Sequence, residues 1–256
     1  MTLPPVFQDW FARQGWQPHP HQLALLGAVG DSLLIAPTGG GKTLAGFLPS
    51  LVDLRDGAAR RGAVHTLYVS PLKALTADIG RNLARPIADL DLPVRVEDRT
   101  GDTGATQRRR QRVDPPEILL TTPESLALML SYPEAPRIFG GLRRVVLDEL
   151  HALAESKRGD QLMLCLARLR HLAPGLRVTG LSATVEDPAA LAGFMAGAAP
   201  VGIIQADPGP DPDIAMLPTA RPAPWAGGGG HYAIPEVLEA VRQARTTIIF
   251  INTRAQ

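Results

Sequence analysis

A short apolar run that leads into a glycine-rich turn and then into a helical pattern is the feature that most restricts the fold of this chain. Residues 33–35 are Leu, Leu and Ile, residues 36–43 read APTGGGKT, and a helical pattern follows to residue 55. Glycines let backbone N–H groups approach phosphate oxygens, and the helix adds the positive end of its dipole. The order strand, loop, helix therefore predicts a phosphate-binding loop. The alternative, a glycine-rich turn with a lysine by chance, would not require a strand before it and a helix after it.

The side chains of this loop suit a nucleoside triphosphate. Lys42 places a positive charge on the outer phosphates, and the hydroxyl of Thr43 is a suitable ligand for Mg²⁺. The strict pattern has glycine six positions before the lysine, where this chain has Ala36. The predicted ATP-binding residues of the loop are Thr38, Gly39, Gly40, Gly41, Lys42 and Thr43.

Short apolar runs alternate with longer helical patterns along most of the chain. We expect strands at residues 32–36, 64–70, 94–98, 117–121, 144–148, 176–182 and 201–205. We expect helices at residues 43–55, 72–90, 123–130, 160–172 and 188–195. Continuous apolar strands alternating with helices predict an α/β fold, a doubly wound parallel sheet with helices on both faces, whose binding sites lie at the carboxyl ends of the strands.

The composition of the 256-residue chain excludes several classes of protein. Apolar residues are 45%, charged residues 20% and the net charge is +1, which excludes a charge-driven disordered chain and a uniformly basic coat protein. No stretch has the roughly 18 apolar residues of a membrane span, so we expect a cytoplasmic protein without a membrane partner. Cys165 lies in an apolar run that predicts a buried, inert thiol, and the six scattered histidines do not favour a zinc site.

The pattern changes near residue 206. Six prolines fall between residues 206 and 225, and four glycines follow at 227–230. We therefore expect a first domain at residues 1–206, a Pro/Gly-rich linker at 207–230, and the truncated start of a second domain at 231–256. The last segment predicts a helix at 235–244 and an apolar strand at 246–252, which cannot bury their apolar faces alone.

An acidic pair follows the apolar strand predicted at 144–148. Asp148 and Glu149 begin the sequence DELH, at the strand end where a parallel sheet holds its ligands. Asp148 is expected to hold Mg²⁺ through water, and Glu149 to polarise the attacking water, so the predicted catalytic residues are Glu149, Lys42 and Asp148. An acidic pair can also simply favour a helix N-terminus. His151 either couples the ATP site to other elements or caps a turn.

These motifs resemble the superfamily 2 DExH-box helicases, in particular the Lhr-like branch and, within it, the ligase-associated DNA-damage-response helicases. The resemblance rests on residues 10–22, 35–51, 70–75, 139–153, 156–160 and 250–256, which together extend over nearly the whole chain. It implies a RecA-like first domain, the start of a second one, ATP and Mg²⁺ as cofactors, 3′-to-5′ translocation on DNA and a role in repair. DNA ligase and nuclease partners are implied in the same way.

The same resemblance implies further site residues. Gln22 matches the glutamine that reads the adenine edge, which suits an amide that both donates and accepts; without its context it would be a helix-surface residue. The residues that match motifs holding a single strand by its phosphodiester backbone are Pro71, Lys73, Thr100, Gly101, Thr122 and Pro123. The residues that match motifs coupling ATP to domain closure are His151, Ser182 and Thr184.

A basic cluster and three alternative functions stay open. Arg108, Arg109, Arg110 and Arg112 form either an electrostatic funnel beside the strand or a solvated helix face. The expected partner is single-stranded or partly duplex nucleic acid, with DNA favoured over RNA. An RNA helicase and an ATP-dependent binding module that never unwinds are the alternatives, and a small-molecule kinase fits the motifs least.

Overall fold

The computed structural model describes residues 2–58, 62–183, 185–197, 200–209, 213–222, 225 and 230–250. The chain divides into two compact units, residues 1–209 and residues 210–256. Each unit is described by itself. The boundaries predicted at residues 206 and 230 stay predictions.

The described part of the first unit is built on a seven-stranded sheet, in the order β3-β4-β2-β5-β6-β1-β7. All neighbouring strands run parallel, with Leu33 of β1, for example, opposite Gly180 of β6. The strands are β1 Ser32–Ile35, β2 Thr66–Val69, β3 Val96–Arg99, β4 Ile118–Thr121, β5 Arg144–Leu147, β6 Arg177–Ser182 and β7 Gly202–Gln205. Each lies within its predicted run or overlaps it, so the parallel α/β fold predicted from the sequence is confirmed.

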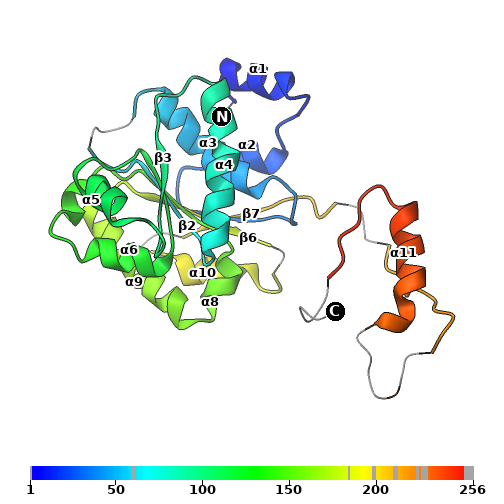
Figure 1. Ribbon diagram of the computed structural model, residues 1–256. Helices are drawn as coiled ribbons and strands as arrows, with labels where there is room; N and C mark the ends of the chain where they lie inside the picture. Colours follow the sequence, from blue (N-terminus) through cyan, green and yellow to red (C-terminus); the bar gives the residue numbers. More distant parts are fainter. Residues whose placement is uncertain are drawn as a thin grey trace. The chain divides into compact units, whose positions relative to one another are not determined.

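Helices cover both faces of this sheet (Figure 1). The helices of the first unit are α1 Pro5–Arg13, α2 Pro20–Gly27, α3 Lys42–Arg55, α4 Lys73–Asp89, α5 Ala105–Val113, α6 Pro123–Leu130, α7 Ala135–Phe139, α8 Leu150–Ala154, α9 Lys157–Leu172 and α10 Pro188–Met195. Successive side chains of a strand point to opposite faces, so Leu33 joins the core under α6 to α10 and Leu34 the core under α1 to α4. None of the described helices is long and apolar enough to cross a membrane.

Side-chain caps fix where several of these helices begin. The Thr122 side chain accepts a hydrogen bond from the N–H of Ser125 at the start of α6. The Ser156 side chain accepts one from the N–H of Gly159, and this cap starts α9 at Lys157, three residues before the predicted start. The helices predicted by residue range from the sequence do not include α1, α2, α5, α7 or α8.

The second unit contains a short 3₁₀ turn, His231–Ala233, followed by the helix α11, Ile234–Gln243. None of the described residues of this unit is buried. The strand predicted at 246–252 is wrong over residues 246–250, which form no strand, and residues 251–252 lie outside the described part. A strand forms only against a partner strand, and the sheet of the described chain pairs β1 to β7 alone. The start of a second RecA-like domain is therefore not evident.

Candidate functional site

The loop between β1 and α3 has the backbone shape of a phosphate cradle. Gly39 and Gly41 have φ values of 81° and 72°, a left-handed conformation that side chains disfavour. Gly41 precedes the first residue of α3, so the loop ends at the positive end of the helix dipole. A Cβ atom on Gly41 would lie 2.8 Å from Nε2 of Gln22, which shows how closely helix α2 approaches the loop.

The lysine of the loop is buried and already oriented. Lys42 is 9% exposed, and its Nζ atom donates a hydrogen bond of 2.9 Å to the carbonyl oxygen of Ala36 at the start of the loop. The ammonium group is therefore held over the loop backbone instead of extending into solvent. Thr43 follows it in the first turn of α3.

The acidic pair lies at the carboxyl end of β5, as predicted. Asp148 is 6% exposed; its Oδ2 accepts a hydrogen bond of 2.5 Å from the Tyr68 hydroxyl and its Oδ1 accepts one of 2.9 Å from the N–H of Glu149. Burial, and then the negative charge of Asp148, raise the pKa of Tyr68, so the hydroxyl remains a donor. Glu149 has a φ of 49°, an unusual conformation for a residue with a side chain.

One cavity of about 770 Å³ joins the loop and the acidic pair. Of the residues predicted to bind ATP or to catalyse, it is lined by Gln22, Thr38, Gly39, Gly41, Lys42, Thr43, Asp148 and Glu149. Gly40 belongs to the loop but does not line the cavity; its Cβ position is 3.0 Å from the carbonyl of Pro37. The structure thus brings together side chains that are 106 positions apart, in a space of the size that holds a small ligand.

Gln22 and His151 each connect the cavity to another segment. Oε1 of Gln22 accepts a hydrogen bond from the N–H of His19 (2.9 Å), and its Nε2 donates to the carbonyl of Gly41 (3.4 Å). Nε2 of His151 lies 3.3 Å from Oε2 of Glu149, and its Nδ1 lies 3.0 Å from Oγ of Ser182 at the end of β6. Thr184 lies outside the described residues.

The residues predicted to hold a nucleic-acid strand also lie at the carboxyl ends of the β-strands, but at a different part of the sheet. Pro71 and Lys73 follow β2, Thr100 and Gly101 follow β3, and Thr122 and Pro123 follow β4, and these three strands are neighbours. None of the six lines the cavity. We call the loops at residues 70–73, 100–103 and 122–124 the strand edge.

Polar contacts hold the strand edge together. Nζ of Lys73 is 2.9 Å from Oδ1 of Asp102, and the Cβ position of Gly101 is 3.1 Å from the same Nζ. The Thr100 hydroxyl accepts a hydrogen bond from the N–H of Asp102 (3.3 Å). Lys73 is the lysine within these loops, and its side chain is 54% exposed.

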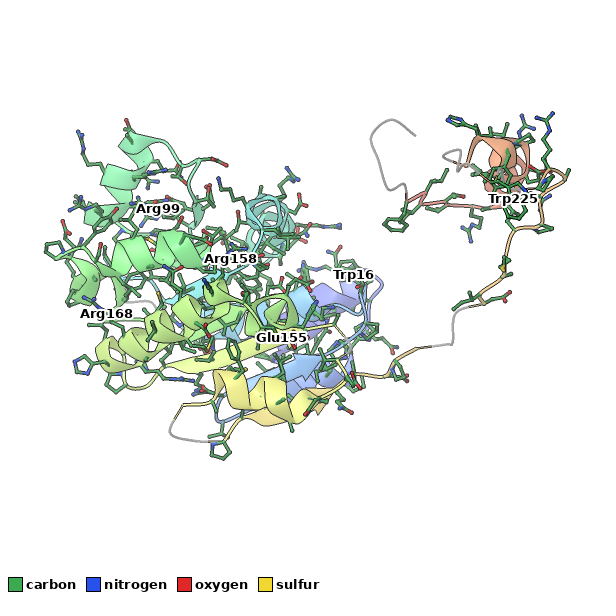
Figure 2. All side chains as sticks on the ribbon, turned by 90° about the horizontal axis from the view of Figure 1, so that it is seen from below. Trp16, Arg99, Glu155, Arg158, Arg168 and Trp225 are labelled. Carbon is green, nitrogen blue, oxygen red and sulfur yellow. The ribbon has the colours of Figure 1, made fainter. Side chains whose placement is uncertain are left out.

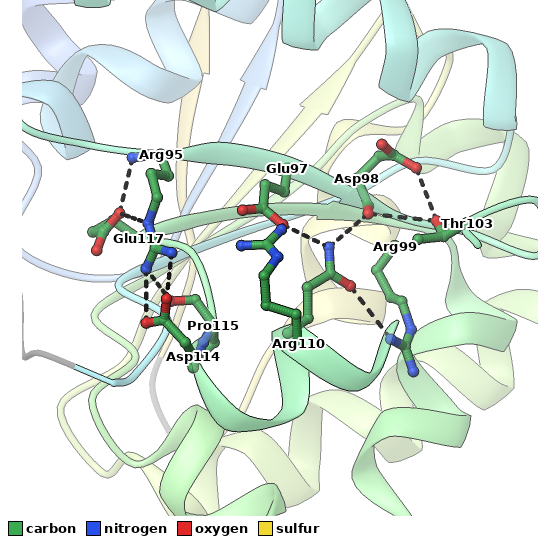
Figure 3. Close-up of polar contacts among 10 residues, drawn as sticks. Arg95, Glu97, Asp98, Arg99, Thr103, Arg110, Asp114, Pro115 and Glu117 are labelled. Carbon is green, nitrogen blue, oxygen red and sulfur yellow. Dashed lines mark hydrogen bonds and ion pairs between the residues drawn. The ribbon is translucent and has the colours of Figure 1, made fainter. Parts of the chain in front are cut away.

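The arginine cluster on α5 is largely occupied by contacts within the chain. Arg110 pairs with Glu97 of β3 (Figure 3). Arg112 pairs with Glu134 (2.7 Å) and lies 4.5 Å above the ring of Tyr132. Arg108 donates to the carbonyls of Thr100 and Gly101. These contacts favour the solvated helix face over the electrostatic funnel.

Three residues that shape the site are not among those predicted from the sequence. Tyr68 holds Asp148, Trp16 lines the cavity at 50% exposure, and Arg158 contacts the strand edge. Trp16 stands in the stretch that carried the resemblance, and a polar hydroxyl within a buried strand is a signal for Tyr68. Arg158 also stands in a stretch that carried the resemblance, residues 156–160, but its contacts could not be predicted because its partners lie 34 and 87 positions away.

Comparison with known proteins gives one family. The DEAD/DEAH box helicase family matches residues 20–191. The chain is 37% identical to the Lhr helicase/uracil glycosylase of Escherichia coli, over 98% of this chain and 19% of that protein. It is 36% identical to the ATP-dependent helicase Lhr-Core protein 2 of Thermococcus barophilus, over 97% of this chain and 32% of that protein.

A solved structure gives the same result. The fold is similar to that of the Mycobacterium smegmatis helicase Lhr bound to ssDNA and AMP-PNP, with a TM-score of 0.79 and 36% identity over 99% of this chain. The match covers 34% of that chain. The present chain thus spans between about a fifth and a third of the length of these relatives.

Proposed function

The chain belongs to the DEAD/DEAH box helicase family, and we propose that it binds and hydrolyses ATP and uses the energy to act on single-stranded or partly duplex DNA. The observation that carries this proposal is the single cavity that holds the phosphate-binding loop and the acidic pair. Two adjacent carboxylates that share a cavity with a buried, oriented lysine suit metal-assisted phosphoryl transfer.

The residues of the cavity divide the chemistry between them. The loop amides and Lys42 bind the phosphates and hold them in place for attack. Glu149 takes the proton of the water whose oxygen bonds to the γ-phosphorus, while the bond to the bridging oxygen breaks and ADP leaves. Because His151 lies 3.3 Å from Glu149 and 3.0 Å from Ser182, the state of this carboxylate is coupled to the end of β6.

Mg²⁺ fits the donors that are present. The hydroxyl of Thr43 and the carboxylate of Asp148 are hard oxygen ligands that line the same cavity. Asp148 is held by two hydrogen bonds, as an outer ligand that acts through water would be. Bound Mg²⁺ would offset the charge of the phosphates.

The strand edge is the proposed DNA site. Its hydroxyls, helix N-termini and single exposed lysine suit phosphate contacts that do not read sequence. The Mycobacterium smegmatis relative was solved with ssDNA, which supports DNA over RNA. The resemblance to the ligase-associated group supports the finer proposal of 3′-to-5′ movement in DNA repair in the cytoplasm, alongside a ligase or nuclease.

The proposal is tested by titrating the 256-residue chain and Lys42→Ala with a fluorescent ATP analogue and Mg²⁺. We expect the variant to lose at least about tenfold in affinity, because a charge-assisted contact to phosphate is lost. Hydrolysis is then measured with a DNA oligonucleotide and with an RNA of the same sequence, and we expect stimulation by DNA. Equal nucleotide affinity of both proteins would contradict the ATP site, and stimulation by RNA alone would favour an RNA helicase.

A further inference from the structure

We propose that Arg158 is a positioning residue that holds two segments of the strand edge at a fixed separation. Its Nε donates to Oε1 of Glu124 (2.5 Å), and its Nη2 donates to Oε2 of the same carboxylate (3.3 Å) and to the carbonyl of Pro71 (2.8 Å). Pro71 follows β2 and Glu124 stands in the first turn of α6 after β4. One guanidinium group therefore joins both loops, and this inference rests on the DNA site proposed above.

The backbone that carries Arg158 is fixed on both sides. The hydroxyl of Ser156 donates to the carbonyl of Leu153 (2.8 Å) and accepts from the N–H of Gly159 (3.2 Å). Gly159 is buried, and a Cβ atom there would lie 2.1 Å from the Leu153 carbonyl oxygen. The backbone that carries Arg158 is thus packed closely against the end of α8.

Helix α8 begins directly after the acidic pair. Leu150 follows Glu149, and five residues later the chain reaches the turn that presents Arg158. The path from Glu149 through α8 to Arg158 and the strand edge contains one short helix, one capped turn and one bidentate ion pair. A bidentate guanidinium pair fixes direction as well as distance, so a displacement of α8 is passed to both loops.

A second explanation is that Arg158 contacts a DNA phosphate directly. The negative charge of its partner Glu124 distinguishes this explanation from the positioning role. If Arg158 simply attracted DNA, Glu124 would oppose it, and neutralising Glu124 would strengthen DNA binding. If the Arg158–Glu124 pair positions the loops, removal of either partner weakens DNA binding, because the loops are no longer held at a fixed separation. The two explanations predict effects of opposite sign for Glu124→Gln.

The experiment measures binding of a fluorescently labelled oligo(dT) to the 256-residue chain over a range of salt concentrations. The variants are Arg158→Gln, Arg158→Lys, Glu124→Gln and the double variant, with Arg168→Gln as control. Arg168 is an exposed arginine of the same helix α9, about 15 Å further along its axis, and the described residues offer it no hydrogen-bond or ion-pair partner. Figure 2 shows Arg158 and Arg168 in separate places.

We expect Arg158→Gln and Glu124→Gln each to weaken DNA binding about tenfold, the loss of one charge-assisted pair, and the double variant to lose no more than either alone. The salt slope should stay that of the wild type, and ATP affinity should change less than about twofold. Arg158→Lys should behave like Arg158→Gln, because a lysine keeps the charge but not the fork.

The inference would be overturned by tighter binding of Glu124→Gln or by full binding of Arg158→Lys. It would also be overturned by a salt slope reduced by about 0.7 in Arg158→Gln, the value for one lost phosphate contact on a single strand. Equal losses in Arg168→Gln would also overturn it. If the wild-type chain bound ATP but no DNA, the proposed DNA site would be wrong. If the wild-type chain bound DNA and the Arg158 and Glu124 variants bound it equally well, only the positioning inference would be wrong.

Discussion

At the scale of single residues, Glu149 stands in a strained position beside the nucleotide cavity. Its φ of 49° is a conformation that costs a residue with a side chain roughly 1–2 kcal/mol. The N–H of Glu149 donates to Oδ1 of Asp148. This hydrogen bond holds the Asp148 carboxylate against the backbone and leaves the Glu149 carboxylate for a different role. Strain of this kind is common where a side chain must be aimed at a ligand.

Replacing Glu149 by Gln tests its role as the base. The amide keeps the shape of the side chain but cannot accept the proton of water, so we expect ATP binding to change little and hydrolysis to slow at least ~100-fold. Turnover is measured by phosphate release in the presence of DNA. Glu155→Gln, an exposed carboxylate just beyond α8, is the matched control and should retain the wild-type rate. Turnover of Glu149→Gln close to that of the wild type would remove Glu149 from the catalytic role.

His65 predicts how the stability of the chain depends on pH. Burial, opposed in part by Asp53 and assisted by Arg144 and Arg143, lowers the pKa of His65 from 6.5 to about 4. Between these two values the unfolded chain binds a proton that the folded chain does not, so the free energy of unfolding should fall as the pH falls from 6.5 to 4, by at most about 3 kcal/mol.

Chemical denaturation of the wild type and of His65→Gln at pH 7, 6, 5 and 4 measures this effect. The difference between the two stabilities should shrink as the pH falls, because the variant has no imidazole to protonate at this position. His171→Gln, an exposed histidine on α9, should run parallel to the wild type. A difference that stays constant over this range would show that His65 has an ordinary pKa in the folded chain.

At the scale of elements, the sequence predicted the strands better than the helices. The strands β1, β2 and β4 are short, largely apolar runs whose residues are all buried, because both faces of the parallel sheet are covered there. The helix α5 shows why others could not be predicted: its only buried residue is Gln111, and it is held to β3 by Gln111 and Arg110 through Glu97. Such contacts between distant residues leave no periodic apolar pattern.

The residues of the nucleotide cavity could be predicted because most of them lie in short, contiguous sequence motifs. The phosphate-binding loop is contiguous in sequence and is flanked by a predicted strand and helix. The acidic pair ends an apolar strand, and together with this loop it indicates a site for phosphoryl transfer. The strand edge could be predicted only through the resemblance. The contacts of Arg158 with Glu124 and Pro71 could not be predicted, because they form only after β2, β4 and α9 have packed.

The junction of α8 and α9 makes a prediction about stability. A methyl group on Gly159 would meet the carbonyl of Leu153 at 2.1 Å, a backbone atom that cannot rotate away. We expect Gly159→Ala to destabilise the chain by about 2–4 kcal/mol, through overpacking and loss of the capped turn. Thermal unfolding measures it.

Gly193→Ala is the matched control, because it makes the same substitution in the helix α10, where the new Cβ would meet no atom within 4 Å outside the adjacent residues and the helix's own backbone. It should leave stability unchanged or raise it by up to about 1 kcal/mol, since alanine favours a helix. Equal effects of the two substitutions would mean that the close approach at Gly159 carries no energy.

At the scale of the whole molecule, one sheet edge serves two proposed sites. The nucleotide cavity draws on the ends of β1 and β5, and the strand edge on the ends of β2, β3 and β4. Because β5 pairs with β2 in the middle of the sheet, the acidic pair stands at the border between the two sites. The sheet therefore supplies a rigid base, and the loops and short helices above it, such as α8, are the parts that can respond to a ligand.

The last prediction concerns residues 210–256. Both hydrophobic cores lie entirely within residues 1–209, and so does every described residue of the proposed sites. No described residue of the second unit is buried, so its removal takes no apolar side chain out of a core. A chain of residues 1–209 should therefore unfold cooperatively, with a midpoint within about 3 °C of the full chain, and should bind ATP within about twofold of it. Calorimetry and nucleotide titration of both chains measure these values, and Lys42→Ala in each chain serves as the control for specific binding. A shortened chain that unfolds without cooperativity or loses ATP binding would show that the second unit contributes to the fold of the first.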